Sequence, residues 1–220
     1  MHLSTRLKAS PSIVAFVLYA SAVSCGAIAE QPIPLFDGKT LQGWQGDLEG
    51  WEVVEGSLAL IPGQYARIYT SGQYSDFALT FEFRLTAGAN NGVALRASGD
   101  GDPAYVAMES QILDDTDPSY SKLEPYQYHG SIYGVAPAIR GALKPVGQWN
   151  VQTIRCDGPQ IAVVLNGSTI VDIDLRTVAP SGVTADGKPH PGLERKSGKI
   201  GFLGHADRVF FRSITVTPLD

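Results

Sequence analysis

The segment from Phe77 to Leu85 alternates between apolar residues and other residues along its whole length. The apolar residues occupy every second position: Phe77, Leu79, Phe81, Phe83 and Leu85. A period of two is that of a β-strand, whose successive side chains point to opposite faces. No long window of the chain shows the 3.6-residue period of an amphipathic helix. The segment therefore predicts an antiparallel strand with one face in a hydrophobic core, within an all-β chain.

Ten further short segments have the alternation or the residue content that is typical of strands. They are Trp51–Val54, Ser57–Ile61, Arg67–Thr70, Gly92–Ala97, Tyr105–Leu113, Trp149–Cys156, Ile161–Leu165, Thr169–Ile173, Lys199–Leu203 and Val209–Thr217. Asn166-Gly167 between two of them indicates a type I′ hairpin. Many short strands predict two packed antiparallel sheets, a β-sandwich or jelly roll. The two longest unassigned stretches, 114–148 and 177–197, are expected to be loops of the kind that carry function.

Composition and charge exclude several classes of protein. The 220 residues are 44% hydrophobic and 18% charged, which is an ordinary globular balance rather than that of a disordered chain. A net charge of −5 argues against a nucleic-acid partner, because such proteins gather Lys and Arg. Two cysteines cannot form a disulfide framework. The sequence contains no zinc spacing of Cys and His, and no nucleophile-elbow, phosphate-loop or dinucleotide motif.

The first 29 residues have the pattern of a signal peptide. Arg6 and Lys8 precede an uncharged apolar stretch, 12–24, and Ala27-Ile-Ala29 supplies small residues before a cleavage site. The apolar stretch is shorter than the ~20 residues of a membrane span. We therefore expect a signal peptide over residues 1–29, a single β-sandwich domain over 30–220, and a periplasmic or secreted protein.

A lipoprotein is the alternative for this N-terminal segment. Ala22-Val-Ser-Cys25 resembles a permissive lipobox, with Ala22 in place of the usual Leu. Processing there would leave a lipid anchor on Cys25, whereas cleavage after Ala29 would leave none. Intact-mass analysis of the native product distinguishes the two.

The stretch from Tyr105 to Asp114 places polar residues where a strand could have been apolar. Alternation puts Tyr105, Glu109, Gln111 and Leu113 on one face of this predicted strand. Alternation in Gly92–Ala97 likewise turns Arg96 away from the apolar side. Such a face can be solvated surface, or it can be the floor of a sugar-binding cleft, because sugars bind to carboxylate, amide, guanidinium and aromatic groups.

The run Glu109-Ser-Gln111-Ile-Leu-Asp114 has nearly the spacing of the E-x-D-x-x-E motif of laminarinase-type glycosidases. A retaining glycosidase needs two carboxyl groups roughly 5 Å apart. Here an amide stands in the middle and the final acid is shorter. The run therefore supports that mechanism only weakly, and a retaining glycosidase is kept as an alternative.

Two histidines and a group of aspartates complete the candidate site residues. His205 lies between two late strands, where a histidine can act as a base, a metal ligand or a surface residue. His129 lies among tyrosines in the longer loop, and both a sugar-binding lip and loop packing are open for it. A group of aspartates could ligate calcium, although Asp is also common in turns. The group comprises Asp100, Asp102, Asp114, Asp115 and Asp117.

Seven segments, in order along the chain, resemble one protein family. They are Phe36-Asp-Gly-Lys-Thr-Leu-Gln-Gly-Trp44, Asn90-Asn-Gly-Val-Ala-Leu-Arg96, Glu109-Ser-Gln-Ile-Leu-Asp-Asp115, Gly130-Ser-Ile-Tyr-Gly134, Gly147-Gln-Trp-Asn150, Leu165-Asn-Gly167, and Gly198-Lys-Ile-Gly-Phe-Leu-Gly-His205 continued by Phe211-Arg-Ser-Ile214. This is the 3-keto-disaccharide hydrolase domain. The resemblance extends from about residue 35 to residue 219.

The resemblance implies a concanavalin A-like jelly roll in exported bacterial proteins that act on glycosides oxidised at C3. The family positions that it implies for the cleft are Arg96, Glu109, Gln111, Asp114, Tyr133, His205 and Arg212. The sequence departs from the family at Val163, where the family often has His, and at Leu203-Gly204, where it has Gln-Asp. Both departures remove polar groups that the family has near its site.

The candidate cleft residues suit an elimination reaction. A C3 ketone acidifies the C2 proton, so a base can remove it, expel the C1 substituent and let water add back. We expect His205 or Glu109 to be the base, Arg96 to stabilise the oxyanion, and Gln111 and Tyr133 to orient the sugar. A small-molecule carbohydrate is the expected partner, and calcium is the only cofactor suggested. A lectin-like binding module without catalysis is the other alternative.

Overall fold

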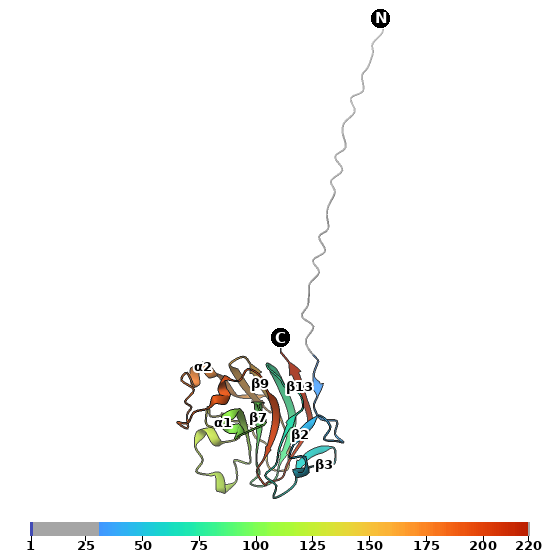
Figure 1. Cartoon of the computed structure of the whole chain (residues 1–220), viewed down its shortest axis with the longest axis vertical. Helices are drawn as coiled ribbons and strands as arrows, with labels where there is room; N and C mark the ends of the chain where they lie inside the picture. Colours follow the sequence, from blue (N-terminus) through green and yellow to red (C-terminus); the bar gives the residue numbers. More distant parts are fainter. Residues whose placement is uncertain (2–30, 220) are drawn as a thin grey trace.

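The computed structural model describes Met1 and residues 31–219 (Figure 1). These residues form two antiparallel sheets that pack face to face around a common core, as the alternation predicts. The predicted signal peptide and Cys25 lie outside the described residues, so their processing stays a prediction. Among the described residues, no helix is long and apolar enough to cross a membrane.

The larger sheet has eight strands. Seven follow the order β11-β10-β9-β6-β13-β4-β3, and β1 pairs with β13. Their bounds are β1 Ile33–Pro34, β3 Trp51–Val54, β4 Ser57–Leu60, β6 Phe77–Leu85, β9 Trp149–Asp157, β10 Gln160–Leu165, β11 Ser168–Asp174 and β13 Val209–Pro218. The predicted strand Phe77–Leu85 is confirmed at both ends. It lies in the middle of this sheet, between β9 and β13.

The smaller sheet has five strands in the order β2-β5-β12-β7-β8. Their bounds are β2 Trp44–Gly46, β5 Arg67–Thr70, β7 Asn90–Ala97, β8 Met108–Leu113 and β12 Lys199–Gly204. One face of this sheet contributes Phe202 and its neighbours to the core between the sheets. The opposite face carries a second, small apolar cluster, which includes Tyr69, Ala94 and Leu203.

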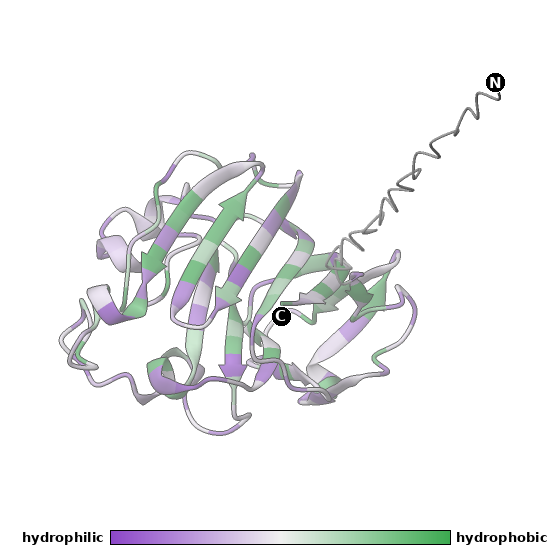
Figure 2. Ribbon diagram, turned by 90° about the horizontal axis from the view of Figure 1, so that it is seen from above, coloured by the Kyte–Doolittle hydropathy of each residue, from purple (hydrophilic) through white to green (hydrophobic). Residues whose placement is uncertain are grey.

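The strands bury one face, as their sequence pattern requires. In β6 the apolar side chains have at most 2% of their surface exposed, and the residues between them are half-buried. Figure 2 shows the resulting alternation of hydrophobic and hydrophilic positions along the strands. The core includes Phe202 and Phe211, whose ring centroids are 4.1 Å apart. Aromatic contacts of this kind add to the stability that burial of apolar area provides.

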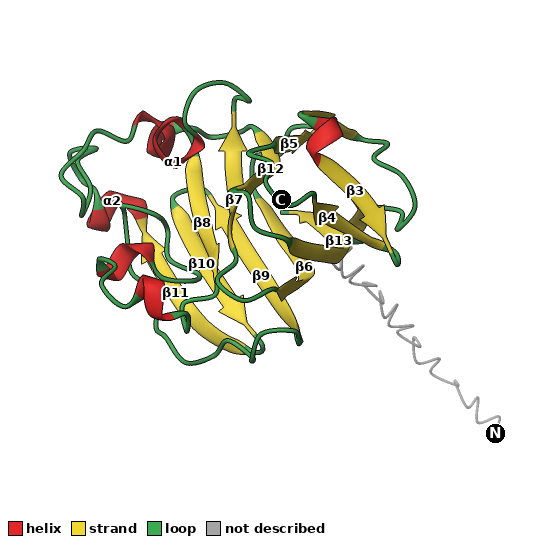
Figure 3. Cartoon of the chain, turned by 90° about the horizontal axis from the view of Figure 1, so that it is seen from below, coloured by secondary structure: helices red, strands yellow, loops and turns green. Residues whose placement is uncertain are grey.

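Short helical turns lie in the connections at the periphery of the sheets (Figure 3). Their bounds are η1 Leu48–Gly50, α1 Pro103–Val106, η2 Pro118–Tyr120, η3 Pro125–Gln127, α2 Leu175–Val178 and η4 Pro191–Glu194. The α1 helix corrects the predicted strand Tyr105–Leu113, which begins only at Met108. Asp102 accepts a hydrogen bond from the Ala104 N–H and Pro103 follows it, and this combination starts a helix.

The predicted hairpin turn is confirmed. Asn166 and Gly167 have φ angles of 51° and 87° between β10 and β11. Two positive φ angles are those of a type I′ turn, whose twist matches that of the flanking strands.

Candidate functional site

A cavity of about 260 Å³ lies on the face of the smaller sheet that points away from the core. Its polar lining comes from strands, from α1 and from the loop after β8. Its polar lining residues include Arg67, Tyr105, Glu109, Gln111, Tyr133 and His205. Four of the eight residues predicted for the site therefore meet in one place: Glu109, Gln111, Tyr133 and His205.

The polar face of β8 is the floor of this cavity and not a solvated surface. Every residue of β8 is buried, and Glu109 and Gln111 are only 7% and 6% exposed. Both faces of β8 are covered because its inner face packs on the core while α1 and the following loop cover the outer one. This face of β8 therefore lines a cavity and is not solvated surface, and sugar binding in that cavity stays a prediction.

Glu109 reaches across the neighbouring strand because Gly92 has no side chain. A Cβ atom at Gly92 would lie 2.0 Å from the Glu109 Oε1 atom. Gly92 pairs with Leu203 on β12, which is the strand that leads to His205. The absence of one side chain thus lets the Glu109 carboxyl lie over β7, on the side of the cavity that His205 lines.

Burial controls the ionisation of Glu109. Removal from water raises the pKa of this carboxyl to about 8, the nearby Asp102 raises it further, and Arg67 opposes the shift. At neutral pH Glu109 is therefore protonated. A protonated carboxyl can donate a hydrogen bond or a proton, which an ordinary surface glutamate cannot do.

The pKa of His205 moves in the other direction. Burial lowers the pKa of its imidazole, and the positive charge of Arg67 lowers it further, while Asp102 and Asp207 oppose the shift. At neutral pH His205 is therefore uncharged and has a free lone pair. The cavity thus contains a neutral acid and a neutral base at the same pH, a combination that suits general acid–base catalysis.

Arg67 is the cation that acts on both Glu109 and His205, and the sequence did not single it out. It begins β5, and its Nη1 donates a hydrogen bond of 2.8 Å to the Gly101 carbonyl. Its backbone N–H donates to the Asp47 carboxylate at 2.9 Å. These contacts hold the guanidinium at the edge of the cavity, where it can stabilise a developing negative charge.

Two buried polar atoms of the cavity have no hydrogen-bond partner among the described residues. They are Gln111 Oε1 and Asn90 Oδ1, and both residues line the cavity. Buried polar atoms are nearly always hydrogen-bonded, so each such exception needs an explanation. Sugar hydroxyl groups are donors that would satisfy both acceptors.

The loop after β8 contributes the opposite wall. Gln127 donates a hydrogen bond from Nε2 to the Tyr133 hydroxyl at 2.9 Å. Gln111 donates to the Gln127 carbonyl at 3.4 Å. Tyr120 and Leu123 also line this wall. The sequence indicated this loop as functional by its length, and the family resemblance named Tyr133 within it. It did not select Tyr120, Leu123 or Gln127.

Arg96 is not part of the cavity, which corrects its predicted place there. Its φ angle is +52°, and the pairing of β7 with β12 shifts register between Lys199 and Gly201. This bulge breaks the alternation from which its position was predicted. The guanidinium turns to the edge of the sandwich, where it pairs with Asp76 at 2.7 Å and donates to the Ser75 and Gly158 carbonyls.

His129 is a core residue and not a sugar-binding lip. It is 4% exposed and stacks on Phe83 with 5.1 Å between ring centroids. Its Nδ1 accepts the Leu113 N–H, and its Nε2 lies 3.1 Å from Gln152 Oε1. Burial lowers its pKa to about 4, so the ring stays neutral. Of the two open interpretations, loop packing is confirmed.

Asp114 and Arg212 also lie outside the cavity lining. Asp114 follows the last residue of β8, and its carboxylate accepts hydrogen bonds from Thr116 and the Gly88 N–H. Arg212 pairs with Glu82 on the outer face of the larger sheet and stacks over Trp149 at 3.9 Å. The register of β13 against β6 fixes this outward position of Arg212.

The two departures from the family motifs have different meanings in the structure. Val163 is fully buried in the core on β10, and it does not line the cavity. The substitution there leaves the cavity lining unchanged. Leu203 does line the cavity, so the Leu at this position makes that part of the floor apolar.

Four of the five aspartates considered for calcium serve turns, a helix cap or an ion pair, and Asp100 is the exception. Asp102 caps α1, Asp117 accepts from Ser119, Asp115 pairs with Arg140, and Asp114 binds Thr116. Among the residues that the structure describes, no three His, Cys, Asp or Glu side chains come together as a metal site. The donor geometry thus gives no support to the calcium hypothesis.

The 3-keto-alpha-glucoside-1,2-lyase-like domain family matches residues 31–217. The chain belongs to this family. It is also 27% identical to a 3-keto-disaccharide hydrolase of Bacteroides thetaiotaomicron, over 87% of this chain and 80% of that protein. These matches confirm the family resemblance that the seven segments indicated.

Solved structures of similar fold agree with the predicted architecture. A crystal structure from Parabacteroides distasonis, provisionally described as a glycosyl hydrolase, is 32% identical with a TM-score of 0.76. The match covers 86% of this chain and 100% of that one. The carbohydrate-binding module CBM66 of Bacillus subtilis shares the fold at 12% identity and a TM-score of 0.52, over 80% of this chain and 95% of that one. The protein is a jelly-roll β-sandwich of the concanavalin A-like kind.

Proposed function

We propose that this protein cleaves 3-keto-glycosides by elimination and hydration. The observation that carries the proposal is that one cavity is lined by both a protonated Glu109 and a neutral His205. Elimination from a 3-keto sugar needs one base and one acid, and it needs no pair of ionised carboxylates. Membership of the family supports the same substrate class, because a relative is a 3-keto-disaccharide hydrolase.

His205 is the base in this mechanism. Its neutral imidazole removes the proton from C2, which the neighbouring C3 ketone has made acidic. The electron pair of the C2–H bond becomes the enolate, whose negative charge rests on the C3 oxygen. Arg67 is placed to stabilise that charge, which is the role that the sequence had suggested for Arg96.

Glu109 is the acid. The enolate re-forms the ketone, a double bond forms between C1 and C2, and the C1–O bond breaks. Glu109 gives its proton to the departing oxygen, so the aglycone leaves as an alcohol. Water then adds across the double bond, with hydroxyl to C1 and a proton to C2, and the two steps together equal hydrolysis. Gln111 and Tyr133 bind the sugar hydroxyl groups and orient the ring.

A product assay tests the substrate class. The purified protein is incubated with a 3-keto-glucoside and with its unoxidised parent, with and without EDTA, and the products are identified by mass spectrometry. We expect release of the aglycone from the keto form alone, and the EDTA samples report any dependence on a divalent metal. Release from the unoxidised parent would instead favour an ordinary retaining glycosidase.

The second candidate function is that of a lectin-like binding module. The observation that favours it is the fold that this protein shares with the carbohydrate-binding module CBM66. Binding of an unoxidised oligosaccharide, with no release from either glycoside, would establish this candidate and refute the enzyme.

We also propose that the chain is exported, because residues 1–29 have the pattern of a signal peptide. Intact mass of the protein isolated from its native cells tests this. A chain that begins at Glu30 is expected, a lipid adduct on Cys25 would indicate a lipoprotein, and an unprocessed N-terminus would refute export.

A further inference from the structure

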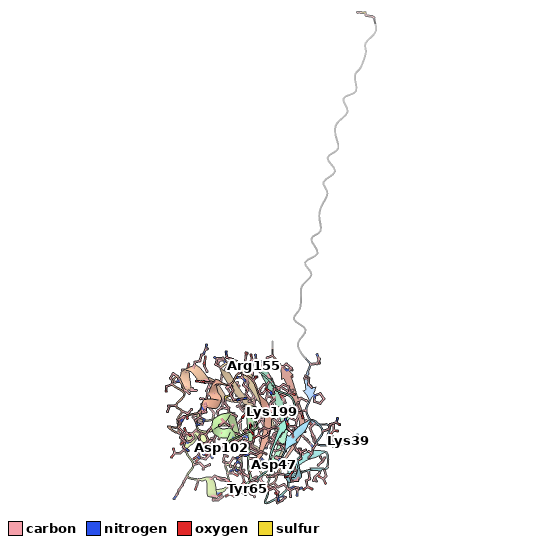
Figure 4. The ribbon with its side chains drawn as sticks, in the orientation of Figure 1. Lys39, Asp47, Tyr65, Asp102, Arg155 and Lys199 are labelled. Atoms are coloured by element: carbon pink, nitrogen blue, oxygen red, sulfur yellow. The ribbon has the colours of Figure 1, made fainter. Side chains whose placement is uncertain are left out.

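Tyr105 of α1 lines the cavity, and its hydroxyl group accepts a hydrogen bond from a lysine. Asp102, which caps this helix, is labelled in Figure 4. The Lys188 Nζ atom donates to the Tyr105 hydroxyl at 2.7 Å, and an ammonium group can only be the donor in such a contact. The Tyr105 O–H itself donates to no residue in the described part of the chain. The phenolic proton is therefore available to a ligand in the cavity.

The two other tyrosines of the cavity show the two uses that such a hydroxyl can have. Tyr120 donates its proton to the Gly88 carbonyl at 3.0 Å, so the fold already uses this proton. Tyr133 resembles Tyr105, because its hydroxyl accepts from Gln127 at 2.9 Å and donates to no described residue. The cavity therefore offers a ligand two phenolic donors, in addition to the two acceptor atoms without a partner described above.

The charge of Lys188 makes Tyr105 the stronger of these two donors. The hydrogen bond to Tyr105 raises the pKa of the Lys188 ammonium above its ordinary value, so this group is charged at neutral pH. A hydroxyl that accepts a hydrogen bond from a cation is polarised, and its own proton becomes a better donor. The amide of Gln127 carries no charge and has a weaker effect on Tyr133.

The segment that carries Lys188 is a short closed loop, residues 182–190, which we call the strap. An isolated β-bridge joins Val183 to Pro189 near its two ends. At its centre, the Asp186 carboxylate accepts a hydrogen bond of 3.0 Å from the backbone N–H of Lys188. A carboxylate inside the strap therefore fixes the backbone position from which the lysine side chain starts.

The same carboxylate also fixes the ring of Tyr105. His190 Nε2 lies 3.3 Å from the Asp186 carboxylate, and the two side chains are 0% and 6% exposed. The His190 ring packs on the Tyr105 ring with 4.7 Å between centroids. A Cβ atom at Gly134 would lie 2.8 Å from Asp186 Oδ2, so the strap packs closely on the loop after β8. One buried carboxylate thus controls both contacts of the tyrosine, the ammonium at its hydroxyl and the imidazole at its ring.

We propose that Tyr105 is a substrate-binding residue that donates a hydrogen bond to an oxygen of the bound sugar. Lys188 is a positioning residue, which orients and polarises this hydroxyl, and the strap holds both groups in place. This proposal deepens the proposed function, because it adds a contact to the sugar that the cavity is proposed to hold.

Three variants separate the hydroxyl from the ring and the charge from the rest of the lysine. Tyr105→Phe removes only the hydroxyl and keeps the packing of the ring. Lys188→Met removes the ammonium at nearly constant length, and Lys188→Arg keeps a positively charged donor. Tyr128→Phe and Lys39→Met are the matched controls, because neither residue lines the cavity. Figure 4 shows Lys39 at the edge of the molecule, away from Asp102.

On a 3-keto-glycoside we expect Tyr105→Phe to raise KM about tenfold with little change in kcat, because it removes a contact made in both the ground state and the transition state. Lys188→Met should raise KM about threefold, and Lys188→Arg should restore it. In the double variant, Lys188→Met should add nothing to Tyr105→Phe, because the lysine acts through the hydroxyl. The controls should match the wild type. An unchanged KM in Tyr105→Phe, or additive losses in the double variant, would overturn the proposal.

Calorimetric binding of a sugar that is not cleaved separates this proposal from the proposed function. The wild type and the variants are titrated with methyl glucoside, which lacks the C3 ketone, and Tm serves as the folding control. We expect Tyr105→Phe to weaken binding about tenfold, even if no glycoside is cleaved. Equal binding by the wild type and Tyr105→Phe, or no binding by the wild type, would contradict the role of Tyr105. Loss of binding in Tyr105→Phe without cleavage by the wild type would support that role and refute the proposed function alone.

Discussion

Two groups of buried polar residues lie close to the smaller sheet, and they differ in one respect. At the edge of the sandwich, Arg96 donates to Asp76 and to backbone carbonyls, and in the core His129 uses both of its ring nitrogens. In the cavity, Gln111 Oε1 lacks a partner within the described residues, and Glu109 and His205 have pKa values displaced by burial. The first group pairs its polar atoms within the fold, whereas the second leaves them available to a ligand.

The comparison shows that burial alone does not identify a functional residue. A buried polar group with its partners in place stabilises the fold, because removing it leaves those partners unsatisfied. A buried polar group that faces a cavity destabilises the fold and is retained for what it binds. Substitutions in the first group should therefore lower stability. Substitutions in the cavity should lower activity instead.

The largest effect is expected in the cavity. His205→Ala removes the base and Glu109→Gln removes the acid, so each should lower kcat/KM on a 3-keto-glycoside about 10²- to 10⁴-fold. Steady-state kinetics with the thermal midpoint Tm as the folding control measures this. If both variants keep nearly normal turnover, the cavity is not the active site.

Arg96→Ala should have the next largest effect, on stability. It removes the guanidinium that pairs with Asp76 and donates to the backbone carbonyls of Ser75, Gly158 and Arg195. Asp76 then keeps only the Gly158 N–H as a donor to the same oxygen. We expect a loss of about 3 kcal/mol in the free energy of unfolding, measured with denaturant. Arg155→Ala is the control, because its pair with Asp157 is half exposed and should contribute less than about 1 kcal/mol. Equal effects of the two variants would refute the structural role of Arg96.

Glu109→Gln should raise stability at neutral pH. The pKa of Glu109 is about 8 in the folded protein and near the ordinary glutamate value of 4.5 in the unfolded chain. The folded state therefore holds a proton that the unfolded state has lost, so this group makes stability fall as pH rises from about 4.5 to 8. Gln cannot ionise, and the variant should gain roughly 1–3 kcal/mol at pH 7 and little at pH 4. A lower stability at pH 7 would show that the Glu109 carboxylate is paired in the fold.

Gly92→Ala should have the smallest effect, and it should be on activity. The added Cβ would lie 2.0 Å from Glu109 Oε1, and the carboxyl must move to make room. We expect kcat to fall about tenfold, because a small displacement of a catalytic group is costly. Gly72→Ala is the control, since its nearest contact would be 3.3 Å from a tyrosine hydroxyl. Unchanged kcat in Gly92→Ala would show that the position of Glu109 over β7 does not matter.

Local pattern predicted the strands well because strand alternation is a local signal. The bounds of β6 and β5 are confirmed, while β1 and β2 were missed because two or three residues are too few to show a period. Glu109 and Gln111 were found for the same reason. Alternation failed at Arg96, where a bulge turns the side chain, and at Tyr105, where a proline and a capping aspartate start a helix.

Long-range pairing was the part that the sequence could not reveal. Arg67 reaches the cavity only because β5 pairs with β12, whose residues are more than a hundred positions away in the chain. The wall formed by Tyr120, Leu123 and Gln127 depends on the path of an irregular loop. The family motifs identified candidate site residues along the chain. They could not separate the residues that line the cavity from the residues that support the fold.

The central claim is that cleavage proceeds by removal of the C2 proton and later return of a proton to C2. Running the reaction in D₂O tests it most directly, with mass spectrometry of the released keto sugar and with free 3-keto sugar in the same buffer as the exchange control. We predict that the enzymatic product carries deuterium at C2 beyond the exchange control, and that Glu109→Gln and His205→Ala produce little of it. Full turnover with no deuterium at C2 would contradict the elimination mechanism.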